Sequence, residues 1–278
     1  MGTKLLNDNT PNMKSTLFSL LLILTGLSIQ NLSAQETKSI SSPDKNLSIT
    51  VLLDKDGMLS YSFNAFKQAA ILNSPMGYSA ENSVTVPSSG WVVENSEQHA
   101  VISVWKPVWG KRSVVPDEYN ELILNLIGPD ASKLQHLRLE VRAYNDGVAF
   151  RYSVPAEEKN SLIAKSESTA WHFAGDYTAW FYNGENANIG PVKLSENDAK
   201  RLPVMTVKAS DKLYMAIHEA NLATGDPLVL QSTKGSTTFS VVSNPGTLEA
   251  GFQSAWRVIL CGKTPGTMVD SHMIELLN

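Results

Sequence analysis

The sequence predicts an all-β protein, a large antiparallel sandwich. In several segments apolar and polar residues alternate, which is the period of a strand with one buried face. Turn-forming residues recur at intervals of roughly 8 to 15 residues, as they do between the short strands of sandwich proteins. No segment after the N-terminal apolar run carries a long helical stripe of apolar residues, so we do not expect helices to build the core.

Composition excludes some classes of partner and of site. The chain has 278 residues, a formal charge of −4 and 42% hydrophobic residues, which is enough for an ordinary core. A slightly acidic chain is not expected to bind nucleic acid, which selects a basic surface. Its one cysteine, Cys261, can form neither an intramolecular disulfide nor a cysteine-based zinc site. We expect Cys261 to be a small buried hydrophobe, because it ends an apolar run.

The N-terminal segment resembles a targeting sequence. Lys14 precedes an apolar run from Leu17 to Ile29, and small residues lead to a cleavage point after Ala34. We therefore predict a signal peptide in residues 1–34, with Met13 as an alternative start that makes residues 1–12 an upstream extension. The run is shorter than the roughly 20 residues that span a bilayer, so we expect no membrane span. The mature domain, residues 35–278, is expected to be exported to a bacterial periplasm.

Two hairpins are the clearest elements. In the first, Leu47, Ile49 and Val51 alternate with polar residues, and a turn ending at Gly57 leads to a second alternating strand. The second hairpin runs from 137 to 154 around the turn Asn145-Asp146-Gly147. Its charged face, with Arg138, Glu140 and Arg142, is expected to be a solvated sheet surface. Residues 69–91 are expected to form only short pieces, because prolines and glycine interrupt them.

The stretch from Trp105 to Leu126 is a rigid aromatic loop followed by a strand. Leu122, Leu124 and Leu126 alternate, whereas Pro107 cannot donate to a sheet. Two readings of the tryptophans Trp105 and Trp109 remain open. Either they fill the end of the core, as large aromatic residues often do, or one indole is exposed as a platform for a sugar ring.

The last third of the chain adds a loop and several strands. Residues 170–191 are rich in Trp, Tyr, Asn and Gly and end without periodicity, which is typical of a binding loop or of a packed surface loop. Leu213, Met215 and Ile217 predict a strand in which His218 and Glu219 point to opposite faces. Residues 237–242, 256–261 and 268–277 are predicted as the last elements.

Five motifs together resemble the N-terminal domain of glycoside hydrolase family 97, a family of α-glucosidases and α-galactosidases. They are WKPVWG at 105–110, YNEL at 119–122, NDGVAFRY at 145–152, HEA at 218–220 and WR at 256–257. The resemblance implies a β-supersandwich similar to galactose mutarotase. It also implies a catalytic (β/α)₈ barrel that should follow and that carries the acid and the base or nucleophile carboxylates. The chain is expected to stop before this barrel, at residues 274–278, which resemble the last strand before it. No catalytic residue is therefore expected in this chain.

The resemblance also implies partners and contact residues. The partners would be the barrel and an α-linked oligosaccharide or a galactoside. Calcium is bound in the intact family enzyme, with one glutamate from this domain in the α-glucosidase branch. An ungapped match places Gly190 at that position, and Glu185 lies nearby without occupying it, so this chain alone is not expected to hold calcium. The expected contacts with ligand or barrel are Trp109, Tyr119, Asn120, Glu121, His218, Glu219, Trp256 and Arg257.

Alternatives remain at the level of residues and of function. Asn120 and Glu121 could instead satisfy nearby backbone groups, and Arg257 could pair with a buried carboxylate. The chain could be a free-standing carbohydrate-binding module with Trp109, Trp180 or Trp256 as platform. A sugar epimerase of mutarotase type would require a histidine and a carboxylate to converge in one cleft, and the five histidines lie in separate segments.

Overall fold

A computed structural model of the protein describes residues 1–2, 35–80, 88–110, 112–222 and 226–278. The chain divides into two units, Met1–Leu32 and Ser33–Asn278, and the fold described below is that of the second. The predicted signal peptide lies almost entirely outside the described residues. Among the helices of the described ranges, none is both long and apolar enough to cross a bilayer.

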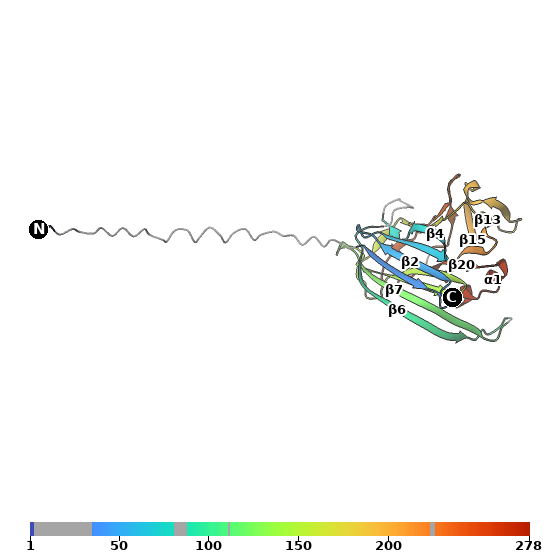
Figure 1. The fold of residues 1–278 in the computed structure, drawn as a ribbon, viewed down its shortest axis with the longest axis horizontal. Coiled ribbons are helices and arrows are strands. Elements are labelled where there is room, and N and C mark those ends of the chain that lie inside the picture. The colour runs from blue at the N-terminus through green and yellow to red at the C-terminus, as the bar shows by residue number, and fades with distance from the viewer. Residues whose placement is uncertain (3–34, 81–87, 111, 223–225) are drawn as a thin grey trace. The chain divides into compact units, whose positions relative to one another are not determined.

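Two antiparallel sheets form the domain and share one strand (Figure 1). The first sheet contains, in order of hydrogen-bonded neighbours, β1 (Glu36–Ser41), β2 (Leu47–Leu53), β3 (Leu59–Ala65), β4 (Gln68–Pro75), β12 (Ala170–Phe173), β18 (Thr238–Val241), β17 (Leu230–Gln231) and β15 (Lys200–Ser210). The second contains β14 (Ile189–Lys193), β13 (Thr178–Tyr182), β15, β16 (Leu213–Ala220), β20 (Trp256–Gly262), β9 (Gly147–Ser153), β8 (His136–Tyr144), β7 (Val115–Ile127) and β6 (Val92–Trp105).

Strand β15 links the two sheets because its two ends pair with different partners. Its first residues, Lys200 and Arg201, pair with β17, whereas the part from Met205 onward pairs with β16. Shorter elements complete the fold: β5 (Tyr78–Ser79) with β11 (Ser166–Glu167), β10 (Leu162–Ala164) with β19 (Gly246–Leu248), the 3₁₀ helix η1 (Leu194–Glu196), and the helices α1 (Pro265–Val269) and α2 (Met273–Leu277).

The predicted sandwich and both predicted hairpins are confirmed. In β2–β3 Ile49 lies opposite Phe63, and in β8–β9 Val141 lies opposite Phe150. These side chains belong to one buried cluster that takes residues from both sheets, so the alternating apolar residues face each other across the sandwich. Cys261 is fully buried in the same cluster, and burial raises the pKa of its thiol to about 12.

One prediction about elements is wrong. Residues 274–278 were expected to resemble the last strand before the barrel, but Met273–Leu277 form the helix α2, which follows α1. Pro265 starts α1 after Thr264, whose hydroxyl accepts the backbone N–H of Thr267, and Met273 and Leu277 are four residues apart on the buried side of α2. Residues 69–91 form short pieces, as expected, where they are described: β4 ends at Pro75, and the two-residue strand β5 follows.

A second buried cluster covers the outer face of the second sheet. It packs side chains of β7, β8, β9, β16 and β20 against α2, and its members include Tyr119, Tyr144, Ala149, Ala216, Trp256, Val258, Leu260, Met273 and Leu277. All seven residues of β20 are therefore buried, since both faces of this strand are covered. Of the predicted contact residues, Tyr119 and Trp256 belong to this second cluster.

Candidate functional site

Arg257 lies in the interior, between two carboxylates from distant segments. Its Nε donates to Glu167 Oε1 at 3.0 Å and its Nη1 to Glu219 Oε2 at 3.2 Å. The side chains of Arg257 and Glu167 are each 1% exposed. Arg257 therefore cannot reach a ligand or a barrel, and the prediction that it makes such a contact is wrong. The alternative of an internal pair with a buried carboxylate is confirmed.

His218 and Glu219 do not act as a pair. Glu219 points inward, where Oε2 also accepts the backbone N–H of Leu228 at 2.7 Å, and burial raises the pKa of its carboxyl. His218 lies on the opposite face, with Nδ1 accepting the N–H of Glu219 at 2.8 Å, and burial lowers the pKa of its imidazole. The predicted opposite orientation is confirmed, and both side chains are partly exposed.

Trp256 is not a platform for a sugar ring. It is 1% exposed, and the guanidinium carbons of Arg142 and Arg151 lie 4.9 and 4.4 Å from the centre of its ring. Both cations therefore cover the indole by cation–π contacts. The prediction that Trp256 contacts ligand or barrel is wrong, because its strand is covered on the outer face as well as on the inner one.

The two arginines over Trp256 are held by carboxylates on neighbouring strands. Arg142 Nε donates to Glu121 Oε1 at 2.8 Å, and Arg151 Nε donates to Glu140 Oε2 at 2.9 Å. The four side chains are only 10 to 20% exposed. The face expected to be solvated is thus a half-buried ladder of ion pairs, and Glu121 is already engaged within it.

Tyr119 and Asn120 flank this ladder. Tyr119 is 7% exposed, with its ring centre 4.9 Å from that of Tyr144 and 4.5 Å from the guanidinium carbon of Arg142. Asn120 Nδ2 donates to the carbonyl oxygen of Ser41 in β1 at 2.8 Å. Tyr119 therefore packs in the second cluster. Asn120 satisfies a backbone group, which confirms the alternative interpretation of this residue.

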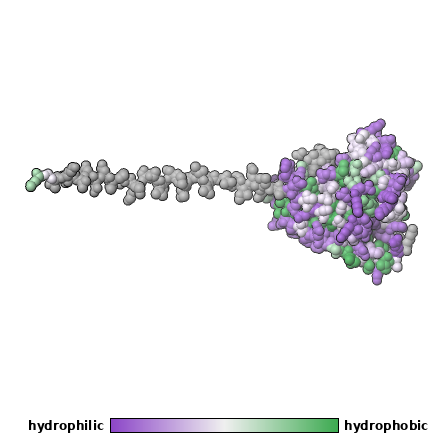
Figure 2. Space-filling model, viewed as in Figure 1, coloured by the Kyte–Doolittle hydropathy of each residue, from purple (hydrophilic) through white to green (hydrophobic). Residues whose placement is uncertain are grey.

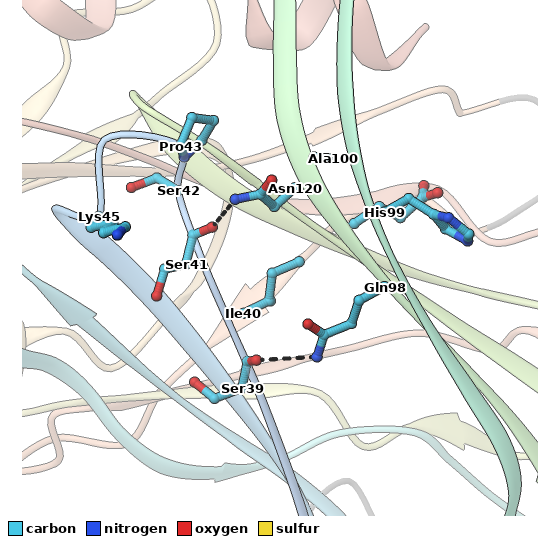
Figure 3. A pocket seen from close by; sticks show the side chains of 11 residues that line it. Ser39, Ile40, Ser41, Ser42, Pro43, Lys45, Gln98, His99, Ala100 and Asn120 are labelled. Carbon is cyan, nitrogen blue, oxygen red and sulfur yellow. Dashed lines mark hydrogen bonds between the residues drawn. The ribbon is translucent and has the colours of Figure 1, made fainter.

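An open groove lies between the edge strands β1 and β6, and Figure 3 shows its lining. Its volume is about 330 Å³. Asn120 and Gln98 both cross it to carbonyl oxygens of β1, Gln98 Nε2 reaching that of Ser39 at 3.4 Å. The groove brings Asn120 and Glu121 together with His99, but not with the other predicted contact residues.

Trp109 is the predicted contact residue that is open to solvent. It is 87% exposed in the loop of the β6–β7 hairpin, and Trp105 at the end of β6 is 38% exposed. Neither indole fills the end of the core, so the structure favours the reading in which an indole is exposed. The same end of the hairpin exposes four further apolar side chains: Ile102, Val104, Val108 and Val114.

The residues that the resemblance associates with calcium do not fit a calcium site in this chain. Glu185 lies exposed between β13 and β14. Gly190 has φ +129°, and an added Cβ would lie 2.6 Å from the carbonyl oxygen of Ala179, so no ligating side chain is accommodated there. Calcium takes six to eight oxygen ligands. No group of three His, Cys, Asp or Glu side chains within the described ranges could hold a metal ion.

Several residues of these clusters were not singled out from the sequence. Arg142 is expected only as part of a solvated face and Arg151 only as part of the motif at 145–152. The sequence gives no sign that a tryptophan from another strand lies beneath them. Glu167 lies where no periodicity marks a strand. The only available signal was Arg257 itself, because a charged residue in an apolar run predicts a buried partner.

Comparisons with known proteins agree with this architecture. The chain is 25% identical over 248 residues to a retaining α-galactosidase of Bacteroides thetaiotaomicron, covering 84% of this chain and 36% of that protein. A Glycoside Hydrolase Family 97 enzyme from Pseudoalteromonas sp. strain K8, solved in complex with acarbose, shares the fold with a TM-score of 0.74 at 24% identity, covering 87% of this chain and 38% of that one. A β-arabinopyranosidase shares the fold with a TM-score of 0.66 at 18% identity, covering 81% of this chain and 40% of that one.

This chain thus spans little more than a third of these relatives. The family model described as "Glycosyl-hydrolase 97 N-terminal" matches residues 40–278, which is most of the chain and all of the sandwich from the fifth residue of β1 onward. The chain belongs to the glycosyl hydrolase 97 N-terminal domain family.

Proposed function

We propose that this chain is the non-catalytic N-terminal domain of an exo-acting α-glycoside hydrolase. In this function it packs on a catalytic barrel and shapes the entrance of the active site, and the substrate is an α-linked oligosaccharide or an α-galactoside. Family membership and the greater length of the relatives support the proposal. Where the whole enzyme uses calcium, we propose that the barrel supplies the ligands, and that the protein works in the periplasm after export.

The exposed apolar end of the β6–β7 hairpin is the observation that carries the packing role. Val108 is 99% exposed, Trp109 87% and Ile102 82%. Figure 2 shows apolar side chains gathered where this hairpin projects from the domain. Apolar patches of this kind on a soluble domain mark contacts with another protein surface or a ligand. A tryptophan at their centre is the side chain most often found to dominate binding energy at an interface.

A chimera tests the packing role directly. The N-terminal domain of the Bacteroides thetaiotaomicron retaining α-galactosidase is replaced by residues 40–278 of this chain, and α-galactosidase activity and melting temperature are measured. We expect a soluble, active chimera. Trp109→Ala should weaken the contact by about 2 kcal/mol or more and lower the melting temperature of the chimera, because a central interface aromatic residue is lost.

Leu72→Ala is the matched control. Leu72 is an exposed apolar residue in the first sheet, 39% accessible and away from the hairpin. The control should leave both the activity and the melting temperature of the chimera unchanged. If Trp109→Ala behaves like Leu72→Ala, the hairpin is not the surface that meets the barrel.

A further inference from the structure

Strand β6 is an edge of the second sheet, and its outer side has no strand beside it. The strand pairs with β7 along its inner side, and among the described residues none outside β7 makes a hydrogen bond to its backbone. Figure 1 shows β6 along the lower margin of the domain. Alternate residues of an edge strand direct their N–H and C=O groups outward, so β6 presents a row of donors and acceptors to another strand.

The edges formed by β1 and β14 are protected, whereas that of β6 is not. Strand β1 has six residues, and the side-chain amides of Gln98 and Asn120 donate to two of its carbonyl oxygens. Strand β14 has five residues and contains Pro191 and Lys193, which are typical of edges that resist pairing. Strand β6 has 14 residues and contains no proline, lysine or arginine. A long edge of this kind is expected to pair with a further strand.

The part of β6 that can pair regularly is residues 95–105. Its register with β7 shifts between Val93 and Asn95, which makes Glu94 the extra residue of a bulge, and continues without a break to Trp105. A two-fold axis pairs a strand with its own copy in the antiparallel direction. Opposite side chains then share a face only when the axis passes through a residue. Ala100 is the middle residue of this stretch, so an axis there pairs all of it and brings two small side chains together.

The charges of β6 are complementary to those of a second copy in this alignment. Glu94 of one copy lies opposite Lys106 of the other, at both ends of the paired stretch, and both side chains are exposed. Opposite charges at such positions stabilise a strand pair, and like charges destabilise it. Glu97 lies opposite Ser103, so no two carboxylates face each other. The pairing also covers part of Ile102, which is 82% exposed in the single chain.

We propose that two copies of this chain pair through β6, antiparallel and about a two-fold axis at Ala100, so that their second sheets form one continuous sheet. The pairing uses the backbone edge of the strand. The loop that carries Trp109 lies beyond the paired stretch and stays available to the barrel. The inference rests on the edge and the charges of β6 and does not depend on the proposed function.

Sedimentation velocity of the full chain at rising concentrations, up to about 100 µM, tests the pairing. We expect a monomer that converts to a dimer as the concentration rises. Ile102→Lys should keep the chain monomeric, because a lysine on an edge strand opposes pairing. Ile163→Lys, the same change at an exposed isoleucine of β10, is the matched control and should dimerise like the parent.

Charge reversal tests the alignment. Glu94→Lys and Lys106→Glu each place like charges at both ends of the pair, so each variant should dimerise about tenfold more weakly than the parent. An equimolar mixture of the two variants should regain the parent affinity, because the mixed pair again has opposite charges at both ends. Association through the N-terminal apolar run would not respond to this mixing. Glu185→Lys, at an exposed loop residue, is the matched control and should not change the affinity.

Three outcomes would overturn the inference: a parent chain that stays monomeric, a dimer that Ile102→Lys leaves intact, or two reversed variants whose mixture does not regain affinity. If the barrel covers this edge instead, the chain should be monomeric and Ile102→Lys should lower the melting temperature of the chimera. An active chimera together with a monomeric chain would refute the dimer alone and leave the packing role intact.

Discussion

Arg257 lies between two carboxylates, and removing its charge leaves Glu167 buried without a counter-ion. The ion pairs join β20 to β11 and β16, three segments far apart in sequence. Breaking a buried pair by removing one partner typically costs about 3–5 kcal/mol. We therefore expect Arg257→Met to lower the free energy of unfolding by about this amount in urea titrations.

The double variant Arg257→Met with Glu167→Gln is the control for this prediction. The single variant leaves the Glu167 carboxylate buried without a counter-ion, and the double variant removes that charge. The double variant should therefore recover part of the lost stability. Lys133→Met, which removes a solvent-exposed pair with Asp130, should leave stability unchanged. A single variant as stable as the parent would show that the cluster contributes nothing to folding.

At the scale of elements, the sequence predicts strands whose apolar residues are buried, including the fully buried β20, and fails for an exposed edge strand and for short helices. The strands of β2–β3 alternate because one face of the hairpin meets the core. In β8–β9 the apolar face that meets the core is still visible in the sequence, although the second cluster covers part of the other face. Strand β6 was not predicted from the sequence. It is an edge strand with most of its residues exposed, so its apolar and polar residues do not alternate. Helices α1 and α2 have five residues each, which is too few to show a helical period. The burial of Trp256 could not be predicted, because the arginines that cover its indole, Arg142 and Arg151, come from segments far away in the sequence.

Glu158 connects the segment after β9 to the start of β8. Its Oε2 accepts the backbone N–H of His136 at 2.8 Å and lies 2.8 Å from the His136 ring nitrogen Nδ1. Oε1 accepts the N–H groups of Lys159 and Asn160, each at 2.9 Å. Burial by itself raises the pKa of Glu158, but these hydrogen bonds prevail and lower it from 4.5 to about 2.

This pKa shift predicts how stability depends on pH. A carboxyl whose pKa is lower in the folded than in the unfolded state stabilises the fold above pH 4.5, and the contribution is lost as pH falls towards 2. The shift corresponds to about 3 kcal/mol for this side chain, which is 2% exposed. Glu158→Gln should therefore be less stable than the parent at pH 7, and the gap should close between about pH 5 and 2. Urea unfolding across that range checks it, and a gap that does not change with pH would contradict the assignment.

At the scale of the whole molecule, the arrangement of carboxylates bears on catalysis. Glycoside hydrolysis needs two carboxyl groups about 5 to 9.5 Å apart across one bond, and one of them must stay protonated near neutral pH. Glu167 and Glu219 share Arg257 in the interior, and Glu121 and Glu140 are each paired with an arginine. Glu118 in β7 and Asp270 after α1 are both exposed to solvent.

We therefore expect the full chain alone to hydrolyse neither p-nitrophenyl α-galactoside nor p-nitrophenyl α-glucoside. The assay is run beside the Bacteroides thetaiotaomicron α-galactosidase, which should release p-nitrophenol under the same conditions, and beside the chimera. Release by the chain that persists after repeated purification and disappears in Glu118→Gln or Asp270→Asn would place a catalytic site in this domain. Release that both variants retain would point to an accompanying enzyme, because neither carboxyl could then be the acid. A silent chain with an active chimera is what a domain that shapes, but does not perform, the reaction should give.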